Sequence, residues 1–222
     1  MERARAIDTT TAPAHRAPDT VWYTAYGSNT HPERLSHYLN GGRPHGAART
    51  YPGSRDPARP RRPCRVELSG TLYFATHSPV WRGGRAFYDP AASGTVLARA
   101  HLVTTGQLSD IVAQEMYREP ESDLDLSEVL GRGRASLGSG RYETLVCPGV
   151  LDGVPVLTFT APWTLHDVEW TRPSAPYLRH LVAGLRDAGA WPASRIAAYL
   201  ADCPGAAGHW TAEAVAALTA GR

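Results

Sequence analysis

The chain contains no lysine, because all 23 of its basic residues are arginine. Arginine in place of lysine, beside abundant Ala, Gly and Pro, is typical of a GC-rich coding sequence and says little about function. The arginines face 21 acidic residues, which leaves a formal net charge of +2. With charges so nearly balanced, no global field favours nucleic acid or an anionic membrane as a partner.

Cysteines and long apolar runs are scarce as well. Cys64, Cys147 and Cys203 are odd in number, widely spaced and form no CxxC pair, which favours free thiols in a reducing compartment. No apolar run approaches the ~18 residues of a membrane span. The first 19 residues carry Arg3, Arg5 and Arg16 without the apolar stretch of a secretory signal. We therefore expect a cytoplasmic protein with no membrane partner.

Several familiar site patterns are missing. There is no GxSxG, no HExxH and no Walker loop, and the segment 131–136 lacks the third glycine of a dinucleotide loop. The nine histidines are dispersed, and His31 and His37 lack the i,i+4 spacing of a metal pair. We expect neither a metal nor a cofactor.

The remaining residues fit one α+β domain. Hydrophobic residues make up 42% of the chain and charged residues 20%, a balance that excludes disorder for most of it. The pattern predicts about five strands and five helices without βαβ regularity, hence a sheet that curls or closes. We expect strands at 21–26, 70–75, 95–103, 141–147 and 154–160, and helices from Pro32, over 107–116, from Pro176 and over 212–218.

Two further stretches are predicted to be irregular. Residues 1–19 lack apolar periodicity and are expected to form a flexible tail. Residues 43–65 hold seven Arg and five Pro, which predicts a long basic loop. Tyr51 is its one aromatic residue, so a solvated loop, or a wall that attracts an acidic substrate, is favoured over a nucleic-acid site. The helices from residue 173 onward are expected to cover the domain formed by 20–172.

The segment Tyr26-Gly27-Ser28-Asn29 lies between a predicted strand and a predicted helix for which Thr30 is the expected cap. A glycine there permits a positive φ and lets a ligand approach the backbone. Amides at a helix N-terminus bind carboxylates and oxyanions. The alternative is an ordinary tight turn in which Ser28 or Asn29 caps the helix, and four residues alone do not decide between the two.

Glu115 is the most informative acidic residue. Leu108, Ile111, Val112 and Glu115 follow the i, i+3, i+4, i+7 spacing of one helix face. A carboxyl group carried toward a core tends to have a raised pKa, which suits a general base. The alternatives are that Glu115 pairs with an arginine or lies at the rim of the helix.

The ordered set of these motifs resembles the γ-glutamylcyclotransferase family. Its features are Tyr-Gly-Ser-Asn after a first strand, a helix with Arg34-Leu35, a helix ending Ala113-Gln114-Glu115 and a later segment with Tyr142, within about residues 21–160. The resemblance implies a small mixed, partly closed β-barrel flanked by helices. Two departures are a longer segment between Glu115 and Tyr142 and the added C-terminal helices.

The resemblance also implies a reaction. In a γ-glutamyl amide the substrate's own α-amine can attack the γ-carbonyl and release 5-oxoproline and a free amine. It implies Glu115 as the general base, the segment Tyr26, Gly27, Ser28 and Asn29 as the binding site of the glutamyl head, and Tyr142 as a wall or donor. Because the nucleophile is tethered, no cofactor or metal is needed.

Two other classes of function remain open at this stage. One is an amidase or acyltransferase with Ser28 or a cysteine as nucleophile, and the other is a non-catalytic module that binds γ-glutamyl compounds. The sequence predicts neither the amine that the γ-glutamyl group carries nor the oligomeric state.

Overall fold

The computed structural model describes residues 3–10, 18–43 and 49–219. Within these ranges the strands are β1 (Arg5–Ala6), β2 (Thr20–Ala25), β3 (Arg61–Ser69), β4 (Thr71–Ser78), β5 (Gly83–Asp89), β6 (Thr95–Thr104), β7 (Arg134–Ser136), β8 (Thr144–Leu151) and β9 (Val154–Thr160). The helices are the 3₁₀ helix η1 (Ser28–Thr30) and the α-helices α1 (Pro32–Asn40), α2 (Thr105–Glu115), α3 (Ser127–Arg132), α4 (Ala175–Ala188), α5 (Ala193–Asp202) and α6 (Ala212–Ala217). The predicted α+β class is confirmed.

Seven strands form one mixed sheet in the order β1-β3-β6-β2-β9-β8-β7. β2 lies at its centre, antiparallel to β6 and parallel to β9. β4 and β5 form a separate antiparallel hairpin. The Thr160 hydroxyl links this hairpin to β9, because it accepts from the Tyr88 amide at 3.1 Å and donates to the Tyr88 carbonyl at 2.7 Å. This arrangement agrees with the mixed, partly closed sheet that the sequence predicts.

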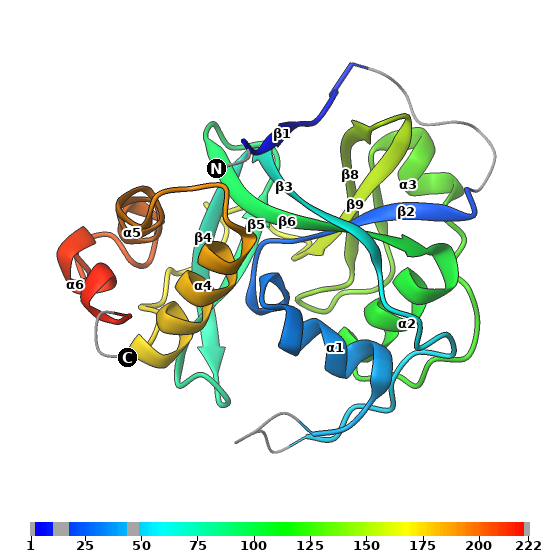
Figure 1. The fold of residues 1–222 in the computed structure, drawn as a ribbon, viewed down its shortest axis with the longest axis horizontal. Coiled ribbons are helices and arrows are strands. Elements are labelled where there is room, and N and C mark those ends of the chain that lie inside the picture. Colours follow the sequence, from blue (N-terminus) through cyan, green and yellow to red (C-terminus); the bar gives the residue numbers. More distant parts are fainter. Residues whose placement is uncertain (1–2, 11–17, 44–48, 220–222) are drawn as a thin grey trace.

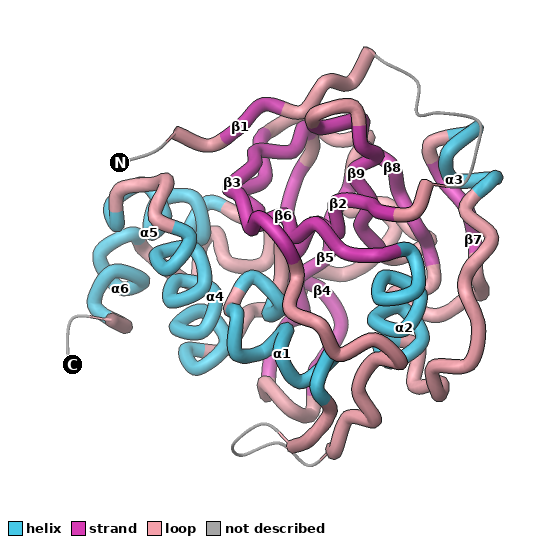
Figure 2. Tube along the Cα trace, turned by 45° about the vertical axis from the view of Figure 1, so that its right-hand side comes forward, coloured by secondary structure: helices cyan, strands magenta, loops and turns pink. Residues whose placement is uncertain are grey.

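Successive side chains along a strand point to opposite faces of the sheet. Both faces of this sheet are covered by other parts of the fold. On β2, Val21, Tyr23 and Ala25 belong to one core, with residues of α1 and α2. Trp22 alternates with these residues on β2, and Tyr26 lies just beyond this strand. Both belong to a second core that includes residues of α4 and α5. Figures 1 and 2 show α4, α5 and α6 gathered on one side of the strands and α2 and α3 on the other.

The C-terminal helices have clear start and stop signals. The Ser174 hydroxyl caps α4 by accepting from the Tyr177 amide at 3.3 Å, and Gly189, at a φ of 76°, ends it. Leu178, Leu181 and Leu185 on one face of α4 are buried. The helices predicted from Pro176 onward are present. Helix α4 packs against η1.

Two predictions about irregular segments are wrong in part. Residues 61–65 of the predicted loop 43–65 belong to β3, and residues 44–48 lie outside the described residues. Pro63 fits in β3 because the pairing with β6 shifts register between Arg61 and Cys64, and such irregularities tolerate a residue without an N–H. Arg5–Ala6 of the predicted tail pair with β3; residues 1–2 and 11–17 lie outside the described part.

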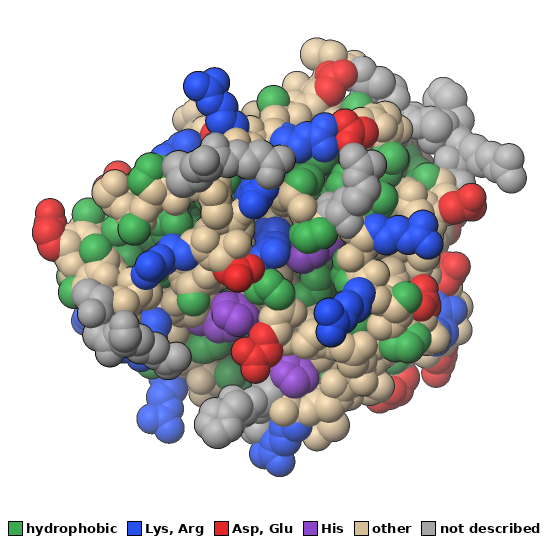
Figure 3. Space-filling model, in the orientation of Figure 1, with side chains coloured by type: hydrophobic (Ala, Val, Ile, Leu, Met, Phe, Trp, Pro, Cys, Tyr) green, Lys and Arg blue, Asp and Glu red, His purple; other side chains and the backbone are tan. Residues whose placement is uncertain are grey.

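Two observations concern the charge on the surface and the length of the helices. On the face in Figure 3 the arginines are dispersed among acidic and neutral side chains rather than gathered into one stripe. Among the described residues, no helix has both the length and the apolar character needed to cross a lipid bilayer.

The link through Thr160 gives a first prediction. Thr160→Val keeps the side-chain shape but leaves the Tyr88 amide and carbonyl without this buried partner. We expect the free energy of unfolding to fall by about 1–3 kcal/mol, measured by urea denaturation. The control is Thr95→Val at an exposed position of β6, for which we expect little change. Equal stability of Thr160→Val and the wild type would contradict this role.

Candidate functional site

Helix α2 carries Glu115 into the interior. The helix starts with a capping box, in which the Thr104 hydroxyl accepts from the Gln107 amide and the Gln107 side chain accepts from the Thr104 amide. Ile111 and Val112 are fully buried, and the same face brings Glu115, the last residue of α2, to a half-buried position. The helix predicted over 107–116 is confirmed, and it begins two residues earlier, at Thr105.

The Glu115 carboxylate is held by one oxygen. Oε1 accepts from the Tyr38 hydroxyl at 2.5 Å and from Asn29 Nδ2 at 3.2 Å. Asn29 Nδ2 also donates to the Tyr23 hydroxyl at 3.0 Å. No described residue donates to Oε2. The carboxylate is therefore fixed in orientation and keeps one oxygen for a ligand.

The two phenols around Glu115 are neutral at physiological pH. Burial, followed by the nearby Glu115 charge, raises the pKa of Tyr38 well above its usual range. The same two causes raise the pKa of Tyr23, against a smaller opposing effect of the Asn29 hydrogen bond. A neutral hydroxyl can donate to a carboxylate, whereas a phenolate cannot. The Tyr38 hydroxyl donates to Glu115 in this way, and the Tyr23 hydroxyl accepts from Asn29.

The loop after β2 brings Asn29 to this carboxylate. Gly27 has a φ of −103°, so the positive φ considered for it is not observed. The Gly27 carbonyl accepts from the Thr30 amide at 3.1 Å and from the Thr30 hydroxyl at 2.8 Å, which forms the 3₁₀ turn. The first amides of a helix have no acceptor within it, so those of Ser28 and Asn29 are the ones that a ligand can use.

The capping predicted for α1 is wrong. The N-cap of α1 is His31 and no side chain caps it, because Thr30 is part of the preceding 3₁₀ turn. Asn29 does not cap either, since its side chain points at Glu115. The turn alternative is therefore right that a turn forms, over Ser28–Thr30, and wrong that Ser28 or Asn29 caps the helix.

A cavity of about 310 Å³ brings the sequence-predicted residues together. It is lined by Tyr26, Gly27, Ser28, Asn29, Glu115 and Tyr142. The Tyr26 hydroxyl donates to the Phe159 carbonyl at 2.8 Å, and the Tyr142 hydroxyl donates to the Ala86 carbonyl at 3.1 Å. Tyr142 precedes β8 rather than lying within a strand as predicted. Both tyrosines form walls of the cavity.

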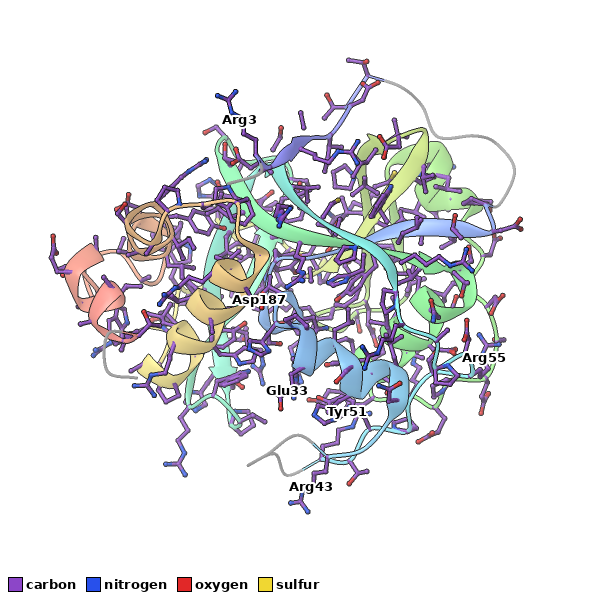
Figure 4. All side chains as sticks on the ribbon, viewed as in Figure 1. Arg3, Glu33, Arg43, Tyr51, Arg55 and Asp187 are labelled. Carbon is purple, nitrogen blue, oxygen red and sulfur yellow. The ribbon has the colours of Figure 1, made fainter. Side chains whose placement is uncertain are left out.

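The cavity has a basic side that includes Arg34, Arg49, Arg85 and Arg141. Arg49 belongs to the loop 43–65, for which a wall that attracts an acidic substrate was one of the two alternatives, whereas sequence reasoning did not place the other three arginines at a site. Arg34 lies over the rings of Tyr38 and Tyr51, at 5.7 and 5.0 Å from their centroids, and donates to the Tyr51 hydroxyl at 2.5 Å. Figure 4 labels Tyr51 close to α1. The i,i+4 spacing of Arg34 and Tyr38 on a predicted helix was the available signal.

Three buried polar atoms of residues that line the cavity have no partner among the described residues. They are Thr24 Oγ1, Asn29 Oδ1 and Arg34 Nε. Buried polar atoms in proteins are generally hydrogen-bonded, and an exception requires an explanation. Asn29 contacts Glu115 through Nδ2, so the free Asn29 acceptor lies near the carboxylate and fits a ligand that carries a donor.

Helix α4 packs against the loop that carries Ser28. Tyr177 lines the cavity, and His180 Nε2 lies 2.9 Å from the Ser28 carbonyl. A Cβ on Gly184 would lie 2.5 Å from Thr30 Oγ1 and 2.9 Å from the His31 amide nitrogen. The C-terminal helices therefore shape the site directly.

Gly184 gives the second prediction. Gly184→Ala forces α4 away from η1, and we expect the free energy of unfolding to fall by about 1–3 kcal/mol, as for other overpacked contacts. Gly131→Ala in α3 is the matched control, because its added Cβ meets nothing within 4 Å. That change should leave the protein unchanged or stabilise it by up to about 1 kcal/mol. The same urea-denaturation response in both variants would contradict close packing of α4 on η1.

No group of three or more His, Cys, Asp or Glu within the described part of the chain is placed to hold a metal ion.

The chain is similar to known proteins in its fold and over one stretch of its sequence. No model of a known protein family matches the chain. The chain is 28% identical over 202 residues to histone deacetylase 5 of Arabidopsis thaliana, an alignment that covers 81% of this chain and 30% of that protein. The chain thus spans under a third of the length of this relative.

Among solved structures, the chain is similar to the uncharacterized human protein loc79017, with a TM-score of 0.50 and 18% identity. The alignment covers 89% of this chain and 96% of the human one, and it shows a shared fold. A γ-glutamyl cyclotransferase structure aligns over 88% of this chain and 95% of its own, with a TM-score of 0.45 and 16% identity.

Proposed function

We propose that the protein is a γ-glutamyl cyclotransferase that releases 5-oxoproline and a free amine from a γ-glutamyl amide. One observation carries the proposal: the oriented Glu115 carboxylate has an oxygen without a donor among the described residues, in a cavity next to the Tyr26–Asn29 loop. The motif resemblance points to the same reaction.

The glutamyl head fits the polar groups at the Glu115 end of the cavity. Its α-carboxylate would accept from the amides of Ser28 and Asn29, as anions do at helix N-termini. Its α-ammonium would donate to Glu115 Oε2 and to Asn29 Oδ1, the acceptor that otherwise has no partner. This pose places the α-nitrogen next to the base and leaves the γ-carbonyl toward the rest of the cavity.

The reaction then needs no water and no enzyme nucleophile. Glu115 removes a proton from the α-ammonium, and the amine attacks the γ-carbonyl carbon to form the new C–N bond. The tetrahedral intermediate collapses by breaking the original amide C–N bond. In total, two protons move from the α-nitrogen to the leaving nitrogen, and Glu115 relays them. Holding the tethered amine in attack geometry is worth roughly 7–11 kcal/mol.

The two alternatives find little support at the site. None of the three cysteines lines the cavity. His180 contacts the Ser28 carbonyl rather than its hydroxyl, so this histidine is not placed as the base that activates a serine nucleophile. A non-catalytic binding module would have the same pocket. The next experiment distinguishes such a module from an enzyme by whether product is formed.

Glu115 gives the third prediction. Glu115→Gln keeps the side-chain size but removes the base, and we expect kcat for 5-oxoproline release from γ-glutamyl compounds to fall by about 10²–10⁴, the usual contribution of general acid–base catalysis. The circular dichroism spectrum should stay that of the wild type. Glu128→Gln, at an exposed position of α3, is the control with unchanged turnover.

Two results would count against this assignment. Turnover of Glu115→Gln at the wild-type rate would remove Glu115 from the mechanism. Tight binding of γ-glutamyl compounds by the wild type without any product would favour the binding module. A cytoplasmic location and a small-molecule partner belong to the same proposal.

A further inference from the structure

One face of helix α4 follows the loop that begins at Gly27. The Tyr177 hydroxyl lies near Gly27, where an added Cβ would approach it to 3.6 Å. One turn further along α4, His180 Nε2 lies 2.9 Å from the Ser28 carbonyl oxygen, and Gly184, another turn on, packs against η1. These three residues of α4 share a face because they are three and four positions apart. Figure 1 shows α4 beside the chain that leads from β2 into α1.

Aromatic side chains hold the His180 ring in place. Its centroid lies 5.2 Å from that of Trp81, in the tip of the β4–β5 hairpin, and 5.0 Å from that of His31. Trp81 also stacks on Tyr177, with ring centroids 4.9 Å apart and 28° between the ring planes. Contacts with two rings from two other segments leave the imidazole little freedom to turn away from the Ser28 carbonyl.

The contact between His180 and Ser28 is a hydrogen bond in which the imidazole donates. Burial lowers the pKa of His180, and the hydrogen bond to Ser28 opposes this effect only in part. The ring is therefore neutral at physiological pH and carries one N–H. Because a carbonyl oxygen only accepts, that proton lies on Nε2. The same oxygen accepts from the His31 amide at 3.3 Å, a length beyond the usual range, so the bond from His180 is the stronger constraint.

The Ser28 carbonyl and the Asn29 amide belong to one peptide group. All peptide bonds between the described residues are trans, and in a planar trans peptide the carbonyl and the N–H point in opposite directions. With its oxygen held toward α4, this peptide directs the Asn29 N–H away from α4. Ser28 and Asn29 both line the cavity. A hydrogen bond at the carbonyl also polarises the peptide and strengthens its N–H as a donor.

We propose that His180 is a positioning residue that directs the Asn29 amide at the α-carboxylate of the γ-glutamyl substrate. The inference rests on the proposed function, in which this carboxylate binds the amides of Ser28 and Asn29. His180 is not among the described residues that line the cavity, so it acts through the peptide group. A donor that is already aimed costs less free energy to order when a ligand binds. Loss of the His180 donor should therefore weaken recognition of the α-carboxylate rather than slow the chemical step.

The test compares two substrates that differ only in the α-carboxylate, γ-glutamyl-alanine and 4-aminobutanoyl-alanine. We expect the wild type to prefer γ-glutamyl-alanine about 100-fold in kcat/KM, because each of two hydrogen bonds to a charged group contributes roughly tenfold. His180→Phe keeps an aromatic ring without the donor, and the preference should fall about tenfold through a higher KM for γ-glutamyl-alanine. Turnover of 4-aminobutanoyl-alanine should not change, because this compound has no carboxylate for the Asn29 amide.

Two further variants distinguish the donor from packing. His180→Gln carries an amide donor close to the position of Nε2, and we expect it to keep most of the preference. His166→Phe makes the same replacement at an exposed histidine and should leave both substrates unaffected. An equal loss for both substrates in His180→Phe would indicate a structural role and overturn the proposal. The same loss of preference in His180→Gln as in His180→Phe would also overturn it.

The position of the proton on His180 gives a test that needs no ligand. In ¹H–¹⁵N correlation NMR spectra of the wild type at neutral pH, we expect the His180 ring to carry its proton on Nε2. A proton on Nδ1 alone would leave no donor for the Ser28 carbonyl and would overturn the proposal. This result does not depend on which reaction the protein catalyses.

Calorimetric binding separates this inference from the proposed function. If the wild type cyclises neither compound, the proposed reaction fails. The role of His180 still stands if γ-glutamyl-alanine binds roughly tenfold or more tightly than 4-aminobutanoyl-alanine, and this difference shrinks in His180→Phe but not in His180→Gln. Binding of neither compound, or equal binding of both by the wild type, would overturn this role.

Discussion

The site depends on holding a carboxylate in one orientation at a place where the fold does not favour a negative charge. Glu115 is the last residue of α2, and the C-terminal end of a helix carries partial negative charge that repels an anion. Partial burial adds to this cost. The Tyr38 hydroxyl and the Asn29 amide offset it directly, and Arg34, stacked on Tyr38, adds positive charge nearby. Without these partners, Glu115 would be a destabilising end to the helix.

Each partner comes from a different element, which explains why the whole fold is needed. The loop after β2 supplies Asn29, α1 supplies Tyr38 and α2 supplies the carboxylate. The central position of β2 in the mixed sheet fixes where that loop begins. Helix α4 then fixes where it goes, through Tyr177, His180 and the close approach at Gly184. Helix α4 is thus part of the support of the site.

Local patterns were enough to predict the elements that bear the site. The aromatic strand before Gly27, the capping box at Thr104 and the face that joins Leu108 to Glu115 are all signals within a few residues. The errors occur in elements whose formation depends on contacts between residues far apart in the sequence. β5, which includes Gly83 and Gly84, gains its order from pairing with β4, and the short β1 gains its order from β3. The partners of Glu115 and the basic wall of the cavity also depend on residues far apart in sequence, which periodicity does not reveal.

The most direct test of the central claim follows the oxygen atoms. The wild-type protein is incubated with a γ-glutamyl amide in ¹⁸O-labelled water, and the products are analysed by mass spectrometry. Attack by the substrate's own amine, assisted by Glu115, predicts 5-oxoproline that contains no label from the solvent. Labelled glutamate as the product would show attack by water or an enzyme acyl intermediate, and would contradict the account.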